Sequence, residues 1–237
     1  MSQCDLHVHT IRSSCGLHTL LEIVTLMREK GFEAFAVTDH GPALDTPRSY
    51  FSVMLRRLPS VIAGVRVFKG IEASIMDVDG SIDCPVWEGV PSYEVVLAGL
   101  HSHDAFSKNT GVEVNTRAVV QAMRKHPEIK ILTHPYFSLL PLDLDVVTDV
   151  AAETETALEI NNSYLLNDKA DPDRLALMLE LAKSKGNLLA VNSDGHVFNE
   201  IGAFGLAFEF MEPFGIAPGM IVNRSFESTL SFLGLDG

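Results

Sequence analysis

The stretch that decides the fold is Cys4-Asp5-Leu6-His7-Val8-His9, a short apolar run that ends in two histidines. Its length and alternation are typical of a β-strand. The period of two along a strand puts His7 and His9 on one face, where a single metal ion can bind both imidazoles. A short strand that ends in metal-binding side chains is the pattern that recurs along the chain.

An amphipathic helix follows this strand. Thr19 and Glu22 have the spacing of a capping box, and Gly31 is placed to end the helix. The apolar side chains between them form one stripe: Leu20, Ile23, Val24 and Met27. The sequence therefore predicts a strand followed by a crossover helix, the connection that joins parallel strands.

The same alternation continues to the end of the sequence. We predict seven strands, at residues 4–8, 34–38, 66–73, 95–100, 129–133, 157–161 and 188–192. Further helices are predicted at residues 48–58, 116–126, 142–153, 173–185 and 226–233. This order indicates an α/β fold, a closed or nearly closed barrel, in a single domain that spans residues 1–237.

The composition is that of a globular protein, with 46% hydrophobic and 21% charged residues. The formal net charge of −13 disfavours binding to long nucleic acid, which requires clustered Lys and Arg. The first residues have no signal-peptide pattern, and no apolar run reaches the roughly 20 residues that span a bilayer. Three cysteines are too few and too scattered for a disulfide framework, so we expect a cytoplasmic protein without a membrane partner. A homo-oligomer stays open.

Metal-binding side chains stand at the ends of the predicted strands, where parallel α/β folds concentrate their function. The candidate ligands are His7, His9, His40, Glu72, His101, His134, Asp194 and His196. A single histidine at a strand end is more often a hydrogen-bonded structural residue than a metal ligand. It is implausible that eight candidate ligands stand at successive strand ends by chance. The set exceeds the three or four protein ligands of one zinc ion, so we predict two or three divalent ions, with zinc, manganese or iron as candidates.

Short motifs around these residues form a larger pattern. They are Asp5-Leu6-His7-Val8-His9-Thr10, Thr38-Asp39-His40-Gly41-Pro42, Gly70-Ile71-Glu72-Ala73, Ala98-Gly99-Leu100-His101, Thr133-His134-Pro135 and Asn192-Ser193-Asp194-Gly195-His196. Their order over residues 5–196 resembles the PHP (polymerase and histidinol phosphatase) superfamily. Val78-Asp79-Gly80 and Glu159-Ile160-Asn161-Asn162-Ser163 are similar to its YcdX-like phosphatase branch. The resemblance implies a distorted seven-stranded TIM-like β/α barrel with a trinuclear, commonly zinc, site that hydrolyses phosphoesters.

The resemblance also implies which residues bind which ion. It gives one ion to His7, His9, Glu72 and Asp194, and a second ion to Glu72, His101 and His134. It gives the third ion to His40 and His196, together with a histidine from the loop after the first strand. That position is Cys15 in this sequence, which departs from the family pattern.

Three interpretations of this departure stay open. Cys15 can bind as a thiolate, which would favour zinc over manganese or magnesium. His18, three residues further on, can swing in, although its place just before the Thr19 cap also suits a surface residue. The third site can also be weak or empty.

Five other residues are candidates for supporting roles. Asp5 and Asp39 can each orient an imidazole as an outer carboxylate, or be buried polar groups bonded to the backbone. Arg12 can hold a phosphate with its forked donors, or be a solvated side chain. Asn162 can donate a hydrogen bond to a phosphate oxygen. His103 can contact the substrate or donate a proton.

The predicted reaction is hydrolysis of a small phosphomonoester by a metal-bound water, with His103 as a less favoured proton donor. A second hypothesis is phosphodiesterase or 3′–5′ exonuclease activity on short nucleic acid. A third is a histidinol-phosphatase-like enzyme, with histidinol phosphate as the substrate. The non-catalytic alternative is a metal-binding module that lost turnover with the change at Cys15.

Overall fold

The computed structural model describes residues 4–44, 51–87, 90–91, 93–102 and 106–236. Its centre is a parallel sheet with strand order β1-β2-β4-β7-β8-β9-β10. These strands are β1 (Cys4–Val8), β2 (Ala34–Val37), β4 (Val65–Ser74), β7 (Val95–Gly99), β8 (Ile129–Leu132), β9 (Ala157–Asn161) and β10 (Leu189–Asn192). A parallel bridge between Val8 and Gly195 joins the first strand to the chain beyond the last. The predicted, nearly closed barrel is confirmed.

The predicted strand positions hold to within a few residues. The largest addition is β4, which extends to Ser74 and pairs with the antiparallel strand β3 (Val61–Ile62). A second small sheet joins β5 (Val86–Trp87) to β6 (Val90–Pro91) and was not predicted. The turn predicted at Asp79-Gly80 is present, because Ile75 bridges Ile82 and Gly80 has a φ of 81°.

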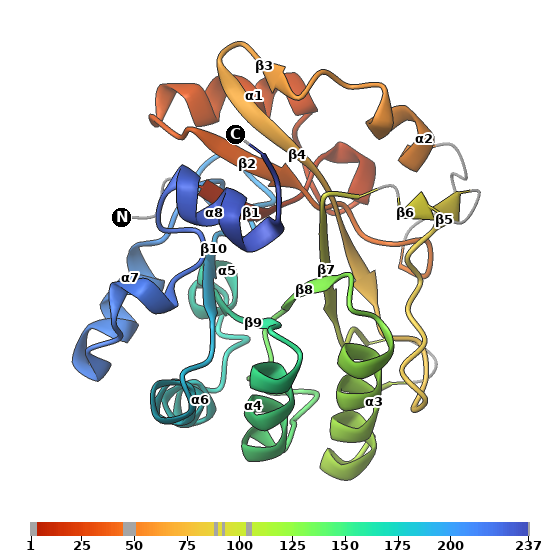
Figure 1. The fold of residues 1–237 in the computed structure, drawn as a ribbon, viewed down its shortest axis with the longest axis vertical. Coiled ribbons are helices and arrows are strands. Elements are labelled where there is room, and N and C mark those ends of the chain that lie inside the picture. The colour runs from red at the N-terminus through yellow and green to blue at the C-terminus, as the bar shows by residue number, and fades with distance from the viewer. Residues whose placement is uncertain (1–3, 45–50, 88–89, 92, 103–105, 237) are drawn as a thin grey trace.

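Helices surround the strands, as Figure 1 shows. They are α1 (Leu20–Glu29), α2 (Phe51–Arg56), α3 (Val112–Lys125), α4 (Leu144–Glu153), α5 (Asn162–Leu166), α6 (Pro172–Lys185), α7 (Gly205–Met211) and α8 (Phe226–Leu233). Short 3₁₀ turns are η1 (Ile11–Ser13), η2 (Glu212–Phe214) and η3 (Pro218–Met220). Among the described residues, no helix has the length and apolar character needed to cross a membrane.

The helix predictions were most accurate where capping residues mark the boundary. Thr19 and Glu22 form the predicted capping box of α1. The prediction of a helix start at 116 was wrong, since α3 begins at Val112 after a glycine cap that offers no side-chain signal. The predicted helix 142–153 starts two residues later, because Asp143 caps it by accepting amides of its first turn. Part of the predicted helix 48–58 lies outside the described residues.

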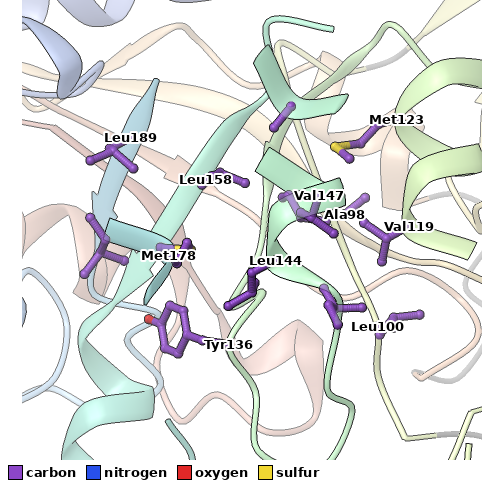
Figure 2. Packing of buried hydrophobic residues seen from close by; sticks show 14 of the residues in the cluster. Ala98, Leu100, Val119, Met123, Tyr136, Leu144, Val147, Leu158, Met178 and Leu189 are labelled. Carbon is purple, nitrogen blue, oxygen red and sulfur yellow. The ribbon is translucent and has the colours of Figure 1, made fainter. Parts of the chain in front are cut away.

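The barrel interior is filled by side chains from all its strands, and α8 closes one end of it. Phe68, Leu97 and Ile131 belong to this interior cluster, and Leu230 and Leu233 of α8 pack against it. A second, larger cluster lies between the sheet and its outer helices. Figure 2 shows strand residues such as Ala98 and Leu158 packed with Val119 and Val147 of the helices. This packing holds the strands rigidly, so their carboxyl ends can position a site.

Candidate metal centre

The candidate ligands come together at the carboxyl ends of the barrel strands. Those in or next to the strands lie almost completely buried: His7, His9, Glu72, His134 and Asp194 are between 0% and 5% exposed. His101 is 9% exposed, and His40 and His196 are half-buried. The eight residues come from segments far apart in the sequence, and the parallel register of the barrel brings them to one edge.

Glu72 lies at the centre of this cluster. Its Oε1 atom is 3.1 Å from Nε2 of His101 and 3.3 Å from Nε2 of His134. Its Oε2 atom is 2.9 Å from Nδ1 of His40. One carboxylate therefore faces imidazole nitrogens on both of its oxygens, which is the arrangement of a bridging ligand.

A second set of close contacts surrounds the two histidines of β1. Nε2 of His7 and Nε2 of His9 lie 3.0 Å apart. Oδ1 of Asp194 lies 3.0 Å from Nε2 of His9 and 3.4 Å from Nε2 of His7. Oε2 of Glu72 is 3.3 Å from the His7 nitrogen, so both carboxylates converge on this pair.

Carboxylates around His7 change its acidity. Burial opposes the charged imidazole, yet the negative charges of Asp194, Glu159 and Glu72 raise the pKa of His7 well above its ordinary value. Conversely, the surrounding histidines outweigh burial and hold the pKa of Glu72 well below its usual range. The cluster therefore favours positive charge at its centre, whether proton or metal ion.

A third group contains the cysteine. Ligand atoms of His9, Cys15, His40 and His196 all lie within 4.8 Å of one another. Burial acts to raise the pKa of the Cys15 thiol, but hydrogen bonds from His196 and His40 outweigh it and lower this pKa to about 7. Nδ1 of His196 lies 2.8 Å from the Asp194 carbonyl oxygen, which leaves Nε2 for a ligand. The thiol sits where a third ion would need it.

His18, the alternative partner, lies apart from this group. Its ring packs edge-on against Phe198, with 6.4 Å between the ring centroids. Among the described residues, no group of potential ligands includes it. The structure therefore brings Cys15 to the cluster and leaves His18 at its margin.

The residues present fit metal ions. The buried Nδ1 atom of His40 and the buried Oδ1 atom of Asp194 have no hydrogen-bond partner of acceptable geometry. Both nevertheless lie within 3.0 Å of another polar atom. A buried polar atom without a partner is unfavourable, and a cation beside each of these two atoms would satisfy it. Among the described residues, the ligand atoms form three groups of three or four, enough for more than one ion.

Contacts with polar and aromatic side chains orient three of the histidine rings. Ser13 Oγ lies 3.0 Å from Nδ1 of His9, and Ser74 Oγ lies 3.1 Å from Nδ1 of His101. The ring of Tyr164 stacks on that of His134, with centroids 4.3 Å apart. Nothing in the sequence pattern identified these three partners, because serines and tyrosines at such positions are common without a role.

Of the two roles left open for Asp5, the structure shows the buried polar group that is bonded to the backbone. Its carboxylate accepts the amides of Ser193 and Gly202 and the backbone amide of His7. The carboxylate at the His7 ring is that of Glu159, whose Oε1 lies 2.7 Å from Nδ1. Asp5 shares the face of His7 but lies deeper in the barrel, where backbone groups are nearer than rings.

Asp39 likewise accepts hydrogen bonds from Thr10 and not from a histidine ring. It accepts the amide and the hydroxyl of Thr10 at 2.7 Å and 2.8 Å. Burial raises the pKa of Asp39, and the charge of Arg12 acts in the opposite sense. Asp39 therefore fixes the loop that carries Arg12 and Cys15.

The remaining candidates are placed as follows. Arg12 lies in η1, between His9 and Cys15, and is half-buried. Oδ1 of Asn162 accepts the amide of Ala207 at 3.1 Å, so this side chain fastens α7, and the predicted donation from its Nδ2 group to a phosphate oxygen stays a prediction. His103 lies outside the described residues.

The sequence is similar to known proteins over most of its length. The sequence model of the PHP domain matches residues 5–139. A probable phosphatase of Syntrophotalea carbinolica is 35% identical over 237 residues, which cover 99% of this chain and 97% of the relative. A probable phosphatase of Shewanella halifaxensis is 37% identical over 235 residues, 98% of this chain and 93% of the relative.

A solved structure shares the fold. The histidinol phosphate phosphatase of Lactococcus lactis, crystallised with zinc, L-histidinol and phosphate, has a TM-score of 0.64 and 15% identity, with 90% of this chain and 94% of that chain covered. The family match covers more than half of the sequence, and the two relatives align over nearly all of it. On this combined evidence the protein belongs to the PHP domain family.

Proposed function

We propose that this protein is a metal-dependent phosphatase that hydrolyses small phosphomonoesters, within one domain that spans the chain. Membership of the PHP domain family and relatives named probable phosphatases support the class of reaction. The observation that carries the proposal is the position of Glu72, whose two oxygens face imidazoles from four different strand ends. A carboxylate so placed is suited to join two metal ions.

The proposed ligand sets overlap with the three groups of close ligand atoms but do not match them residue by residue, because His40 also lies with Glu72 and His101. The first ion takes His7, His9, Glu72 and Asp194, and the second takes Glu72, His101 and His134. The third takes Cys15, His40 and His196. The second and third sets have three protein ligands each, which leaves a position for water or substrate, and the first set has four.

We propose zinc as the metal. Most of the proposed ligand atoms are imidazole nitrogens, and one is a thiolate sulfur. Such ligands suit zinc better than manganese or magnesium. The low pKa of Cys15, about 7, makes the thiolate available near neutral pH. This argument is strongest for the third position and weaker for the first, where two carboxylates contribute.

Divalent ions bound there would activate a water and neutralise charge on the phosphate. The chain supplies the rest. Buried Glu72 and Asp194 hold the ligand geometry, and Asp39 holds the loop after β1 against Thr10. We propose that Arg12, in that loop, binds a phosphate oxygen with its forked donors.

The substrate is proposed to be small because the protein is acidic. A net charge of −13 opposes long polyanions, whereas a single phosphate group can be drawn to a local cluster of cations. Short oligonucleotides remain the alternative, and comparing a mononucleotide, a dinucleotide and single-stranded DNA as substrates separates the two.

The test is release of phosphate from a small aryl phosphate. Activity should vanish after chelation and return with zinc, and Asp194→Asn should lose it. A fully metallated protein that is inactive on a broad panel of phosphoesters would overturn the proposal. If wild type and Asp194→Asn carried the same metal and showed equal, negligible turnover, the protein would be a metal-binding module.

A further inference from the structure

Glu159, at the end of β9, is a buried carboxylate with a polar hydrogen-bond partner on every side. It is 0% exposed. Its Oε1 lies 2.7 Å from Nδ1 of His7 and accepts Nδ2 of Asn192 at 2.9 Å. Its Oε2 accepts the backbone amide of His134 at 3.1 Å and Nδ2 of Asn161 at 3.0 Å. One side chain thus contacts two candidate metal ligands from different ions.

Three of these four partners can only donate. The His134 partner is a backbone N–H. Oδ1 of Asn192 accepts a backbone amide of β1 at 3.1 Å, so its amino group must face Glu159. Oδ1 of Asn161 accepts a backbone amide of α5 at 3.0 Å, so its amino group faces Glu159 as well. Glu159 is therefore surrounded by donors whose orientation is fixed elsewhere.

This arrangement determines the tautomer of His7. Because both Glu159 oxygens act as acceptors, Nδ1 of His7 must carry a hydrogen. A neutral imidazole then has its lone pair on Nε2, the atom that lies 3.3 Å from Oε2 of Glu72 and 3.4 Å from Oδ1 of Asp194. The lone pair is aimed at the proposed first ion.

The second contact supports a strained backbone. His134 has a φ of 34°, in the left-handed region that residues other than glycine seldom adopt. The bond from its N–H to Glu159 holds the amide at this point, and Nε2 of the same residue lies 3.3 Å from Oε1 of Glu72. The backbone conformation and the ring position are therefore set together.

We propose that Glu159 is a positioning residue that holds His7 in its metal-binding tautomer and His134 in its strained conformation at once, and so couples the first and second ion positions. The proposal rests on the metal centre of the proposed function. It predicts that the two ions depend on Glu159 and that the third, on Cys15, His40 and His196, does not.

Glu159→Gln is the informative variant because it keeps the size and removes one acceptor. If the new amino group faces His7, Nδ1 must accept, and the hydrogen moves to Nε2 and blocks the ligand. If it faces His134, two N–H groups oppose each other at a strained residue. Either orientation weakens one of the two positions.

The experiment is zinc titration of the metal-free proteins against a chromophoric chelator. Zinc affinity at the first or the second position should fall by about 10- to 100-fold in Glu159→Gln, because that is the usual loss when the hydrogen-bond partner of a metal ligand is removed. Glu128→Gln is the control, since Glu128 also contacts a histidine, His126 Nδ1 at 3.1 Å, but away from the candidate ligands. It should keep its zinc affinity. Wild-type affinity at every position in Glu159→Gln would overturn the inference.

A second measurement needs no variant. Long-range ¹H–¹⁵N spectra of zinc-loaded wild type should show His7 with a hydrogen on Nδ1 and the metal on Nε2. A metal on Nδ1 would overturn the inference even if Glu159→Gln failed to fold. Wild type that binds no zinc would instead overturn the proposed function, so the two failures are distinguishable.

Discussion

Glu72 and His40 lie opposite each other in a parallel bridge beyond the end of β2, and Nδ1 of His40 is 2.9 Å from Oε2 of Glu72. Backbone bonds flank the bridge, from Gly41 N to Glu72 O at 3.0 Å and from Glu72 N to Asp39 O at 3.2 Å. The register of the sheet therefore fixes the distance between a carboxylate and an imidazole that we assign to neighbouring ions.

The first prediction concerns this carboxylate. Glu72→Gln should lower zinc affinity by more than about 100-fold, because Glu72 is proposed to contact two ions directly. Removal of a residue that only hydrogen-bonds a metal ligand lowers the affinity by about 10- to 100-fold. Zinc content by mass spectrometry after dialysis and phosphatase activity should fall together. Glu128→Gln is the control, since Glu128 also pairs with a histidine, His126 Nδ1 at 3.1 Å, but away from the site. Equal zinc content in both variants would contradict the assignment.

The second prediction concerns thiol reactivity. In metal-free protein near pH 7, iodoacetamide should modify Cys15, which is exposed and whose pKa is about 7. Burial raises the pKa of Cys4 to about 11 and that of Cys84 to about 12, so both should react slowly. Zinc should protect Cys15, as read by peptide mass spectrometry. Equal rates of Cys15 modification with and without zinc would rule out thiolate ligation.

The third prediction separates Cys15 from His18. Cys15→Ala should bind one zinc ion fewer than wild type, whereas His18→Ala should bind the full number, because Cys15, and not His18, lies with His40 and His196. The reverse result would restore His18 as the third ligand. The sequence left this choice open because the path of the loop depends on η1, where Cys15 N donates to the Ser13 carbonyl.

The fourth prediction is a pH dependence. Despite burial, Glu72 and Cys15 raise the pKa of His40 to about 10, and Cys15 and Asp194 raise that of His196 to about 9 in the metal-free protein. At pH 7 both rings are then protonated, and zinc must displace those protons to bind. Zinc affinity should therefore rise with pH between 7 and 9, with proton release seen by calorimetry in two buffers. A pH-independent affinity would contradict it.

The fifth prediction concerns stability. Tyr136→Phe should lower the free energy of unfolding by about 1–3 kcal/mol, since it leaves the buried amide of Asn161, now 2.7 Å from the Tyr136 hydroxyl, without an acceptor. Urea denaturation of the metal-free protein measures this. An unchanged midpoint and slope would show that the amide has another partner.

The strands and most ligands could be predicted because they follow simple rules. Period two placed His7 and His9 together, and parallel strands bring their carboxyl ends to one edge. These rules do not say which carboxylate reaches a ring. Asp5 lies on the same face of β1 as His7, but too deep in the barrel to contact a histidine ring. Glu159 contacts His7 from β9, a strand that is distant in the sequence and lies between β8 and β10 in the sheet.

Helix boundaries were predictable where side chains cap them. Asp171 accepts amides of the first turn of α6, and the predicted helix 173–185 agrees with Pro172–Lys185. The starts of α3 and α7 have no capping side chain, and α5 has only five residues, so pattern alone could not locate them. Tertiary packing decides such elements.

The most direct test of the metal centre is a crystal structure of the zinc-loaded protein with anomalous data at the zinc edge. We predict three peaks, two of them joined by Glu72 and the third in contact with Cys15, His40 and His196. No peak between Glu72 and its histidines, with zinc bound elsewhere on the protein, would contradict the account.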